Sequence, residues 1–296
     1  MREAIFQGSG VAIVTPFRGD GVDFPAFGDL IDWQIEQGTD AIVVCGTTGE
    51  SAVMTDAEKR RTIEYCVERV NGRIPVIAGS GTNDTAHAIR LSRDAESAGA
   101  DALLLVTPYY NKATQKGLIA HYRAIADVVR RPCILYNVPS RTGVNIAPET
   151  CAELANHENI IGIKEASGNL GAVQDIRRLC PDDFYIWSGN DDQIVPICAY
   201  GGMGVISVLA NIMPAEIHDL TKLCLDNNFI AAGKKQIDLK LLCDAMFCEV
   251  NPIPVKTALN LMGRNAGEFR LPMCPPDDAH EIFIRRALKS YGLIQD

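Results

Sequence analysis

Eight short runs of apolar and β-branched residues recur through residue 210, and this recurrence most constrains how the chain can fold. Helix-like stretches separate them. In one, Thr55 and Glu58 predict a capping box, and another ends at Gly99. The runs are apolar almost throughout, which is typical of parallel strands buried on both faces. The expected strands are 11–17, 41–46, 75–81, 102–108, 133–139, 160–167, 184–190 and 204–210.

Regular alternation of strands and helices predicts right-handed βαβ units, and eight of them favour a closed (β/α)8 TIM barrel of the α/β class. No GxGxxG motif follows the first run, which argues against a doubly wound dinucleotide-binding sheet. After Asn211 the strand pattern stops, and Pro214 predicts the start of a helix. We therefore expect a barrel carrying the active site over residues 1–226 and a C-terminal helical subdomain over residues 227–296.

The composition excludes several classes of protein. The 296 residues are 47% hydrophobic and 22% charged, as in ordinary globular domains, and the net charge of -9 without a basic stretch argues against nucleic acid or membranes as partners. The N-terminal residues lack a secretory signal pattern, so a cytoplasmic location is expected. The ten cysteines form no CxxC pair and the five histidines no HxxxH spacing, which predicts reduced core thiols and no metal site.

Polar side chains follow several predicted strands where those strands end, and catalytic groups of (β/α)8 barrels lie at these ends. Thr47 and Thr48 lie between glycines in GTTGE, a pattern whose backbone N–H groups and hydroxyls can converge on a carboxylate. Arg141 can clamp a second carboxylate. Tyr136 is expected to point into the barrel on the same face as Ile134 and Val138. Each residue alone also fits an ordinary turn, core or surface role.

Lys164 is the unusual residue of the strand expected at 160–167. Alternation predicts that Gly162, Lys164 and Ala166 share one face, with Ile161, Ile163 and Glu165 on the other. The two small residues would leave room in the barrel for the lysine side chain, and burial favours a neutral amine that attacks carbonyls. A lysine near a strand end can also reach water. Together with the other polar groups, however, it indicates Schiff-base chemistry on a 2-oxo acid.

The order and spacing of seven motifs resemble the dihydrodipicolinate synthase family, within the wider group of Schiff-base pyruvate aldolases. The resemblance covers nearly the whole chain, from about Gly8 onward. The lysine motif and YNVP would indicate only the wider group, whereas Arg141 within SRTG points to the synthases. The motifs are GTTGE, TPYYNK, YNVPSRTG, GIKEAS, SGNDD, GGMGVISV and NPIPVK.

The resemblance implies that pyruvate condenses with L-aspartate 4-semialdehyde to give 4-hydroxy-tetrahydrodipicolinate, the first step of the diaminopimelate branch of lysine biosynthesis. The resemblance implies no cofactor, with pyruvate held as a covalent imine on Lys164. A homotetramer of two tight dimers is implied as well. The implied roles are Tyr136 as general acid and base in a proton relay with Thr47 and Tyr110, Thr48 on the pyruvate carboxylate, Arg141 on the semialdehyde, and Gly189, Asn190 and Ile206 lining the pocket.

The resemblance also implies an allosteric site at Ser51, Asn83 and Tyr109. Asp56, Lys59 and His87 depart from the pattern of lysine-inhibited members, and Lys59 would repel a cationic effector, so weak or absent inhibition by lysine is expected. Two alternatives stay open at this point. One is an N-acetylneuraminate or 2-keto-3-deoxy sugar-acid lyase with the same Schiff base, against which Arg141 argues; the other is a non-catalytic barrel that binds a 2-oxo acid.

Overall fold

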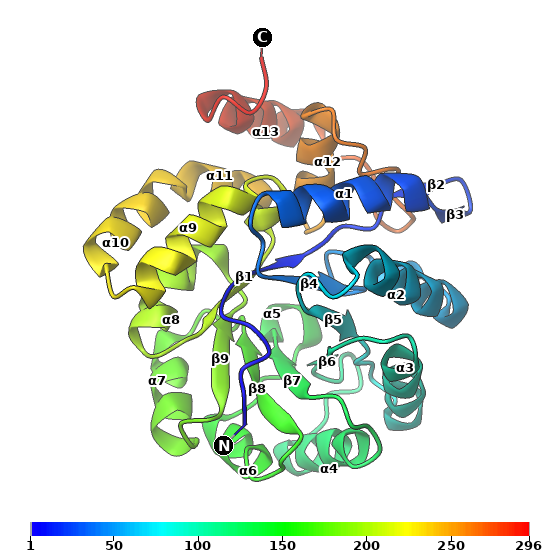
Figure 1. Ribbon diagram of the computed structural model, residues 1–296, viewed down its shortest axis with the longest axis vertical. Helices are drawn as coiled ribbons and strands as arrows, with labels where there is room; N and C mark the ends of the chain where they lie inside the picture. The colour runs from blue at the N-terminus through cyan, green and yellow to red at the C-terminus, as the bar shows by residue number, and fades with distance from the viewer. Residues whose placement is uncertain (1, 296) are drawn as a thin grey trace.

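Eight parallel strands close into a barrel with helices around it in the computed structural model, which describes residues 2–295 (Figure 1). Around the barrel the order is β1-β10-β9-β8-β7-β6-β5-β4, so chain neighbours pair throughout. The predicted TIM barrel is therefore confirmed. The barrel strands are β1 (Gly8–Ala12), β4 (Ala41–Val44), β5 (Val76–Gly79), β6 (Ala102–Val106), β7 (Cys133–Asn137), β8 (Ile160–Glu165), β9 (Tyr185–Ser188) and β10 (Gly204–Ser207), while β2 (Phe17–Arg18) and β3 (Gly21–Val22) pair separately.

At least one helix follows each barrel strand and leads back to the start of the next. The outer helices are α1 (Phe24–Glu36), α2 (Asp56–Val70), α3 (Thr85–Ser97), α4 (Gln115–Ala126), α5 (Pro139–Thr142), α6 (Pro148–Leu154), α7 (Leu170–Leu179), α8 (Ile194–Ala199) and α9 (Pro214–Leu225). Short 3₁₀ turns are η1 (Ser51–Val53), η2 (Asp191–Gln193) and η3 (Leu209–Asn211). The capping box of Thr55 and Glu58 is present, and Pro214 begins α9 as predicted.

The first strand begins earlier than the apolar run suggested. It was expected from Val11, but β1 starts at Gly8 and ends at Ala12. The residues Gly8, Ser9 and Gly10 carry almost no hydrophobic strand signal, yet they pair in register with Gly204–Ile206 of β10 and so close the barrel. Pairing with a distant strand, rather than local propensity, therefore decides where β1 begins.

Apolar side chains form two clusters, one inside the barrel and one between the strands and the helices. Ile134, Tyr136 and Val138 all belong to the interior cluster, as the alternation along β7 predicts. Trp187 lies in the same cluster and stacks on Phe6, with ring centroids 5.3 Å apart. The barrel is thus a packed core, and β7 directs Tyr136 into it.

The prediction for Ile161 was wrong. Ile161 packs in the interior cluster, whereas Ile163 packs against the helix layer as expected. The register between β7 and β8 shifts at this point, because Cys133 pairs with Ile160 but Ile134 pairs with Gly162. The extra residue is Ile161, and such a bulge breaks strict alternation. From Gly162 onward the predicted faces hold.

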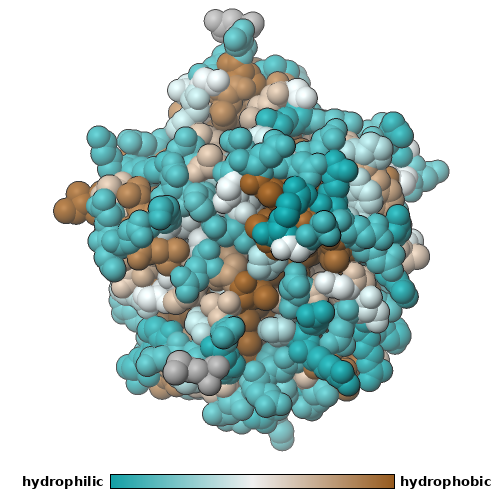
Figure 2. Space-filling view, viewed as in Figure 1, coloured by the Kyte–Doolittle hydropathy of each residue, from teal (hydrophilic) through white to brown (hydrophobic). Residues whose placement is uncertain are grey.

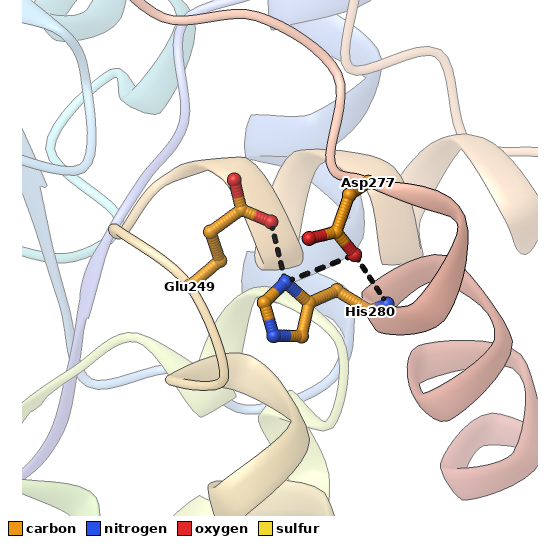
Figure 3. A group of neighbouring side chains, drawn as sticks. All are labelled: Glu249, Asp277 and His280. Carbon is orange, nitrogen blue, oxygen red and sulfur yellow. Dashed lines mark hydrogen bonds and ion pairs between the residues drawn. The ribbon is translucent and has the colours of Figure 1, made fainter.

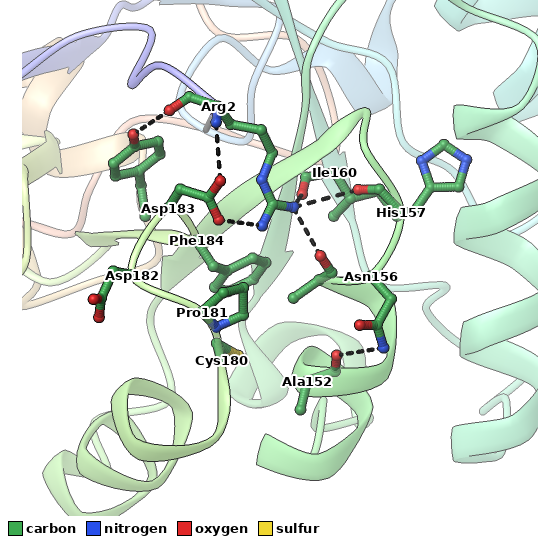
Figure 4. A network of polar contacts seen from close by, with 12 residues as sticks. Arg2, Ala152, Asn156, His157, Ile160, Cys180, Pro181, Asp182, Asp183 and Phe184 are labelled. Carbon is green, nitrogen blue, oxygen red and sulfur yellow. Dashed lines mark hydrogen bonds and ion pairs between the residues drawn. The ribbon is translucent and has the colours of Figure 1, made fainter.

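Arg2 joins the segments that lead into β8 and β9, at the end of the barrel where these strands begin (Figure 4). Arg2 donates to the carbonyls of Ala155 and Ile160, both at 2.8 Å, and forms an ion pair with Asp183 at 2.7 Å. The Tyr185 hydroxyl donates to the Arg2 carbonyl at 2.6 Å. Hydrogen bonds from Arg2 hold the pKa of Asp183 down at about 2. This end of a TIM barrel serves stability rather than catalysis.

The chain after α9 contains helices, as expected. They are α10 (Phe229–Asp238), α11 (Lys240–Met246), α12 (Ile253–Leu261) and α13 (Asp278–Ser290). The helix α10 packs against α9, and both α11 and α12 pack against α13 (Figure 1). The boundary at residue 226 stays a prediction.

Ile230 and Ile237 of α10 are 91% and 75% exposed, and Figure 2 shows hydrophobic surface at that edge of an otherwise mainly hydrophilic face.

Two predictions from composition can be compared with the described chain. All ten cysteines are free and eight are buried, but Cys274 is exposed and Cys248 is half-buried, so the expectation of core thiols was wrong for these two. Both lie in the C-terminal part of the chain, outside the strands whose apolar runs suggested burial. Within residues 2–295 no helix has both the length and the apolar character that crossing a bilayer requires.

Candidate active site

Lys164 lies near the carboxyl end of β8 with only 5% of its surface exposed. It pairs in register with Tyr136 of β7 on one side and with Trp187 of β9 on the other. Its ammonium nitrogen lies 4.4 Å from the centroid of the Tyr136 ring. Among the described residues, no hydrogen bond or ion pair reaches that nitrogen. A buried amine beside a phenol, with no carboxylate bound to it, is arranged for nucleophilic and proton-transfer chemistry.

The space around Lys164 has a different origin from the one predicted. A Cβ at Gly162 would lie 2.2 Å from the Tyr185 carbonyl oxygen and 3.0 Å from the Trp187 ring, so the neighbouring strand fills this space. A Cβ at Gly189 would instead lie 3.0 Å from Cε of Lys164 and 2.6 Å from Cβ of Ala166. It is therefore Gly189, at the end of β9, that leaves room beside the lysine.

Glu165 points to the opposite face and fixes the ends of β7 and β8. Its carboxylate accepts hydrogen bonds from the Asn137 side-chain amide at 2.9 Å and the Ser167 backbone N–H at 2.6 Å. The side-chain oxygen of Asn137 in turn accepts from the backbone N–H of Ile146 at 3.0 Å. Burial raises the pKa of Glu165, and the hydrogen bonds to its carboxylate oppose the shift. The network holds the two strands that carry Tyr136 and Lys164 in register.

Asp191 is a second buried carboxylate at the same end of the barrel. It accepts hydrogen bonds from the Ser207 hydroxyl and from the backbone N–H groups of Val208 and Leu209, the latter two at 3.1 and 3.0 Å. Burial raises the pKa of Asp191, while these hydrogen bonds and the nearby charge of Lys164 lower it. Asp191 thus joins the turn after β9 to the end of β10.

The GTTGE loop is anchored to α12 by an ion pair that the sequence did not predict. Glu50, in the left-handed conformation with φ +53, binds Lys256 of α12 at 2.7 Å, and both side chains are buried. Lys256 also donates to the carbonyl oxygens of Thr15 and Glu268, at 3.1 and 2.6 Å. Burial lowers the pKa of Lys256, and the Glu50 carboxylate opposes this. The C-terminal helices therefore hold the loop that carries the two threonines.

Asn251, just before α12, links two of the predicted binding residues. Its side-chain amide donates to the Thr48 hydroxyl oxygen at 3.0 Å. The Arg141 guanidinium donates to its backbone carbonyl at 3.0 Å. Thr48 and Asn251 are buried, whereas Arg141 is exposed on α5. The structure thus brings Thr48 and Arg141 together through a residue from the C-terminal helical region.

Two cavities open at the carboxyl ends of the strands, on either side of α5. One of about 570 Å³ contains Thr47 and Arg141 together with all three predicted allosteric positions, Ser51, Asn83 and Tyr109. Asp56, Lys59 and His87 line the same cavity, and His87 is paired with Asp56 at 2.8 Å. The other cavity, of about 340 Å³, contains Asn190 and Ala166.

The remaining predicted residues differ in how they are placed. Ile206 of β10 is fully buried in the interior cluster with Tyr136. Tyr110 does not join the other candidates, because 91% of it is exposed and its φ is +71, a backbone conformation that tyrosine rarely adopts. Its neighbour Tyr109 shares a hydrogen bond with the Thr82 hydroxyl at 3.2 Å. Tyr110 therefore points away from the barrel in the single chain.

Glu249, Asp277 and His280 form one group of described residues whose donor atoms lie close enough together to hold a metal ion (Figure 3). Each contact also has a structural explanation. Asp277 caps α13 through the His280 backbone N–H at 2.8 Å, and the His280 ring binds Glu249 at 2.9 Å. The group joins α13 to the segment that contains Asn251. We assign it this anchoring role.

Asn251, Lys256, Glu50 and Asp191 were not predicted as part of the site. Their contacts link residues far apart in the chain: Asn251 reaches Thr48 across 203 positions, and Lys256 reaches Glu50 across 206. The sequence signals were the motifs NPIPVK, which contains Asn251 and Lys256, and SGNDD, which contains Asp191, together with the charged residue that ends GTTGE. None of them indicates a partner, because no local periodicity connects the segments.

Comparison with known proteins shows the family to which the chain is related. Residues 5–291 match the model of the Dihydrodipicolinate synthetase family. The chain is 54% identical over 293 residues to the 4-hydroxy-tetrahydrodipicolinate synthase of Thermoanaerobacter pseudethanolicus, covering 99% of each chain. It is similar to the dihydrodipicolinate synthase structure from Aquifex aeolicus, with a TM-score of 0.96, 44% identity and coverage of 98% and 100%. A monomeric dihydrodipicolinate synthase variant gives a TM-score of 0.96 at 41% identity, with 98% of both chains covered.

Proposed function

This chain belongs to the Dihydrodipicolinate synthetase family, and we propose that it condenses pyruvate with L-aspartate 4-semialdehyde to form 4-hydroxy-tetrahydrodipicolinate. The observation that carries the proposal is the buried Lys164 amine, 4.4 Å from the Tyr136 ring and bound to no carboxylate in the described chain. The activity serves the diaminopimelate branch of lysine biosynthesis. It fits the acidic chain, which has no basic stretch for nucleic acid.

The reaction begins when the Lys164 amine attacks the keto carbon of pyruvate, and loss of water gives a protonated imine. This imine withdraws electrons, so the methyl group loses a proton and becomes an enamine carbon. That carbon attacks the aldehyde of the second substrate and forms the new carbon–carbon bond. The substrate's amino group then attacks the imine carbon, closes the ring and releases Lys164 as a free amine.

Tyr136 acts as the proton carrier in these steps. Its position on the strand next to Lys164 supports this role, because each step transfers a proton at the pyruvate adduct of Lys164 or at the aldehyde that this adduct attacks. Thr47 and Tyr110 complete the proposed relay. Thr48 binds the pyruvate carboxylate, and Arg141 binds the carboxylate of the semialdehyde. Gly189, Asn190 and Ile206 line the pocket, and the short distance from Gly189 to Lys164 supports this for Gly189.

The exposed position of Tyr110 is relevant to the oligomeric state. We propose a homotetramer of two tight dimers in which Tyr110 enters the site of the neighbouring subunit. Its 91% exposure and its positive φ support this, because a strained, exposed tyrosine gains most from burial against a partner. Sedimentation of the purified protein measures the mass directly. A monomer with full activity would remove Tyr110 from the relay.

Borohydride trapping tests the chemistry. The protein is incubated with pyruvate, reduced, and digested, and the modified peptide is identified by mass spectrometry. We expect one pyruvate-derived adduct on Lys164 and, in a separate assay, turnover with L-aspartate 4-semialdehyde. An adduct without that turnover, but with cleavage of N-acetylneuraminate or a 2-keto-3-deoxy sugar acid, would assign the lyase activity. No adduct, or an adduct on another lysine, would contradict the proposed mechanism.

A further inference from the structure

Asn251 is the residue through which the C-terminal helices reach the barrel site. Its side chain donates to the Thr48 hydroxyl oxygen at 3.0 Å, and its backbone carbonyl accepts from Arg141 at 3.0 Å. One residue therefore contacts a group proposed to bind pyruvate and a group proposed to bind the semialdehyde. The two contacts use different parts of the residue, so a side-chain substitution separates them.

The direction of the first hydrogen bond has a chemical consequence. A threonine hydroxyl carries one proton and two lone pairs. Because the Asn251 amide donates to the oxygen, one lone pair is occupied and the hydroxyl proton stays free to donate elsewhere. A carboxylate accepts hydrogen bonds and cannot donate one when ionised. The Asn251 amide therefore sets Thr48 as a donor, which is the role a carboxylate substrate needs.

The other side-chain atom of Asn251 supports a functional position. Its carbonyl oxygen is buried and accepts no hydrogen bond from the described residues. Buried polar atoms without a partner are rare, and each costs about 1–3 kcal/mol. An asparagine kept only for stability would be expected to satisfy both ends of its amide. Asn260, in the same region, does so by donating to the Gly267 carbonyl and accepting from the Ala266 N–H.

The segment that holds Asn251 is itself fixed from outside the barrel. Two residues earlier, Glu249 binds the His280 ring of α13 at 2.9 Å (Figure 3). Five residues later, Lys256 binds Glu50 of the GTTGE loop. The carbonyl that receives Arg141 and the amide that contacts Thr48 are thus held between α13 and the loop.

We infer that Asn251 is a positioning residue that orients the Thr48 hydroxyl toward the pyruvate carboxylate, while its backbone carbonyl holds Arg141 independently for the second substrate. This inference rests on the proposed function. It assigns a role in substrate binding to the C-terminal helical region, which otherwise lies outside the barrel. It also makes a specific prediction: side-chain changes at Asn251 weaken pyruvate binding and spare the aldehyde substrate.

The test uses the full-length protein and pyruvate as the probe. Wild type, Asn251→Ala, Thr48→Val and the double variant are trapped with borohydride over a range of pyruvate concentrations, and KM is measured for both substrates. In Asn251→Ala we expect the half-saturating pyruvate concentration to rise about tenfold, as for a lost hydrogen bond to a charged group, with the semialdehyde KM within about twofold of wild type. In the Thr48→Val background, Asn251→Ala should cause no further rise in the half-saturating pyruvate concentration.

Asn251→Asp is the second variant, because it keeps the shape of the side chain and removes the donor. The Thr48 hydroxyl must then donate its proton to the introduced carboxylate. The half-saturating pyruvate concentration should therefore rise more than in Asn251→Ala. Asn260→Ala is the matched control, since it removes an asparagine of the same region that does not contact the barrel site; its pyruvate half-saturation should stay at the wild-type value.

The outcomes separate the two hypotheses. If wild type forms no adduct, the proposed function and this inference both fail. If wild type forms the adduct and Asn251→Ala saturates at the same pyruvate concentration, only the positioning role fails. Two results would mean that Asn251 only stabilises the region. One is an equal rise of KM for both substrates in Asn251→Ala, and the other is an equal rise of the half-saturating pyruvate concentration in the wild-type and Thr48→Val backgrounds.

Discussion

Two buried lysines of this protein have opposite surroundings. Lys256 is fully buried, and its ammonium is satisfied by the Glu50 carboxylate and two backbone carbonyls. Lys164 is almost as buried, yet among the described residues no hydrogen bond or ion pair reaches its nitrogen, which lies 4.4 Å from the centroid of the Tyr136 ring. Burying an ammonium is costly unless it is paired. We infer from this difference that Lys256 stabilises the fold, whereas the Lys164 amine is available for reaction.

The largest expected effect is the loss of activity in Lys164→Met. Without the amine no imine forms, so we expect turnover to fall by at least about 10,000-fold. The thermal midpoint should not fall, because methionine fills a similar volume and the lysine donates no hydrogen bond to the described residues. Activity assays and calorimetry on the same sample measure both. A marked drop in the midpoint would show that Lys164 also supports the fold and would weaken the contrast.

Lys256→Met should produce the reverse pattern. It leaves the Glu50 carboxylate buried without its partner, which costs about 3–5 kcal/mol of unfolding free energy. Urea denaturation followed by circular dichroism measures this loss. The double variant with Glu50→Gln should recover part of it, because the uncompensated charge is gone. If the single variant were as stable as wild type, the assignment of Lys256 to stability would be wrong.

Tyr136→Phe tests whether the neighbour of Lys164 is a proton carrier or only a packing residue. Removing the phenolic hydroxyl should lower kcat by about 100- to 1,000-fold, with the ring and the fold retained. Tyr185→Phe is the matched control: it removes a hydroxyl from the opposite end of the barrel, where it donates to the Arg2 carbonyl. That variant should keep its kcat. Equal kcat values for wild type and Tyr136→Phe would leave Lys164 without its proposed partner.

The ion pair of Arg2 and Asp183 extends the comparison to a partly exposed site. Arg2→Ala should lower the unfolding free energy by about 1–2 kcal/mol at pH 7, because two backbone carbonyls lose their donor. The pKa of Asp183 is lowered from 3.8 to about 2, so its contribution is present above the unfolded value of 3.8 and is lost as the pH falls through about 2. The difference in unfolding free energy between wild type and Arg2→Ala should therefore become smaller as the pH falls below about 3.8. A constant difference would assign the effect to the carbonyl contacts alone.

The smallest expected effect concerns Lys59, which lines the cavity shared by Ser51, Asn83 and Tyr109. Its positive charge disfavours a cationic ligand there, so millimolar L-lysine should change turnover by less than about twofold. Initial rates with and without L-lysine measure this. Strong inhibition would show that the negative charge of Asp56, which lines the same cavity, outweighs the positive charge of Lys59.

The order of elements, the barrel and most residues at its rim could be predicted from the amino-acid sequence. Apolar runs and helix caps are local signals, so they predicted the strands and the capping box of Thr55. The alternation along β7 correctly placed Tyr136 inside the barrel. The resemblance of the motifs indicated the family that the comparisons then confirmed.

Tertiary structure alone decided the features that depend on distant pairing. The shift between β7 and β8 reversed the expected side of Ile161, and pairing with β10 set the start of β1. The space beside Lys164 comes from Gly189, which follows β9. The partners of Thr48 and Glu50, Asn251 and Lys256, come from the C-terminal helical region. The physical reason is that a buried polar group must find its partner in space, and neither propensity nor periodicity specifies which distant segment provides it.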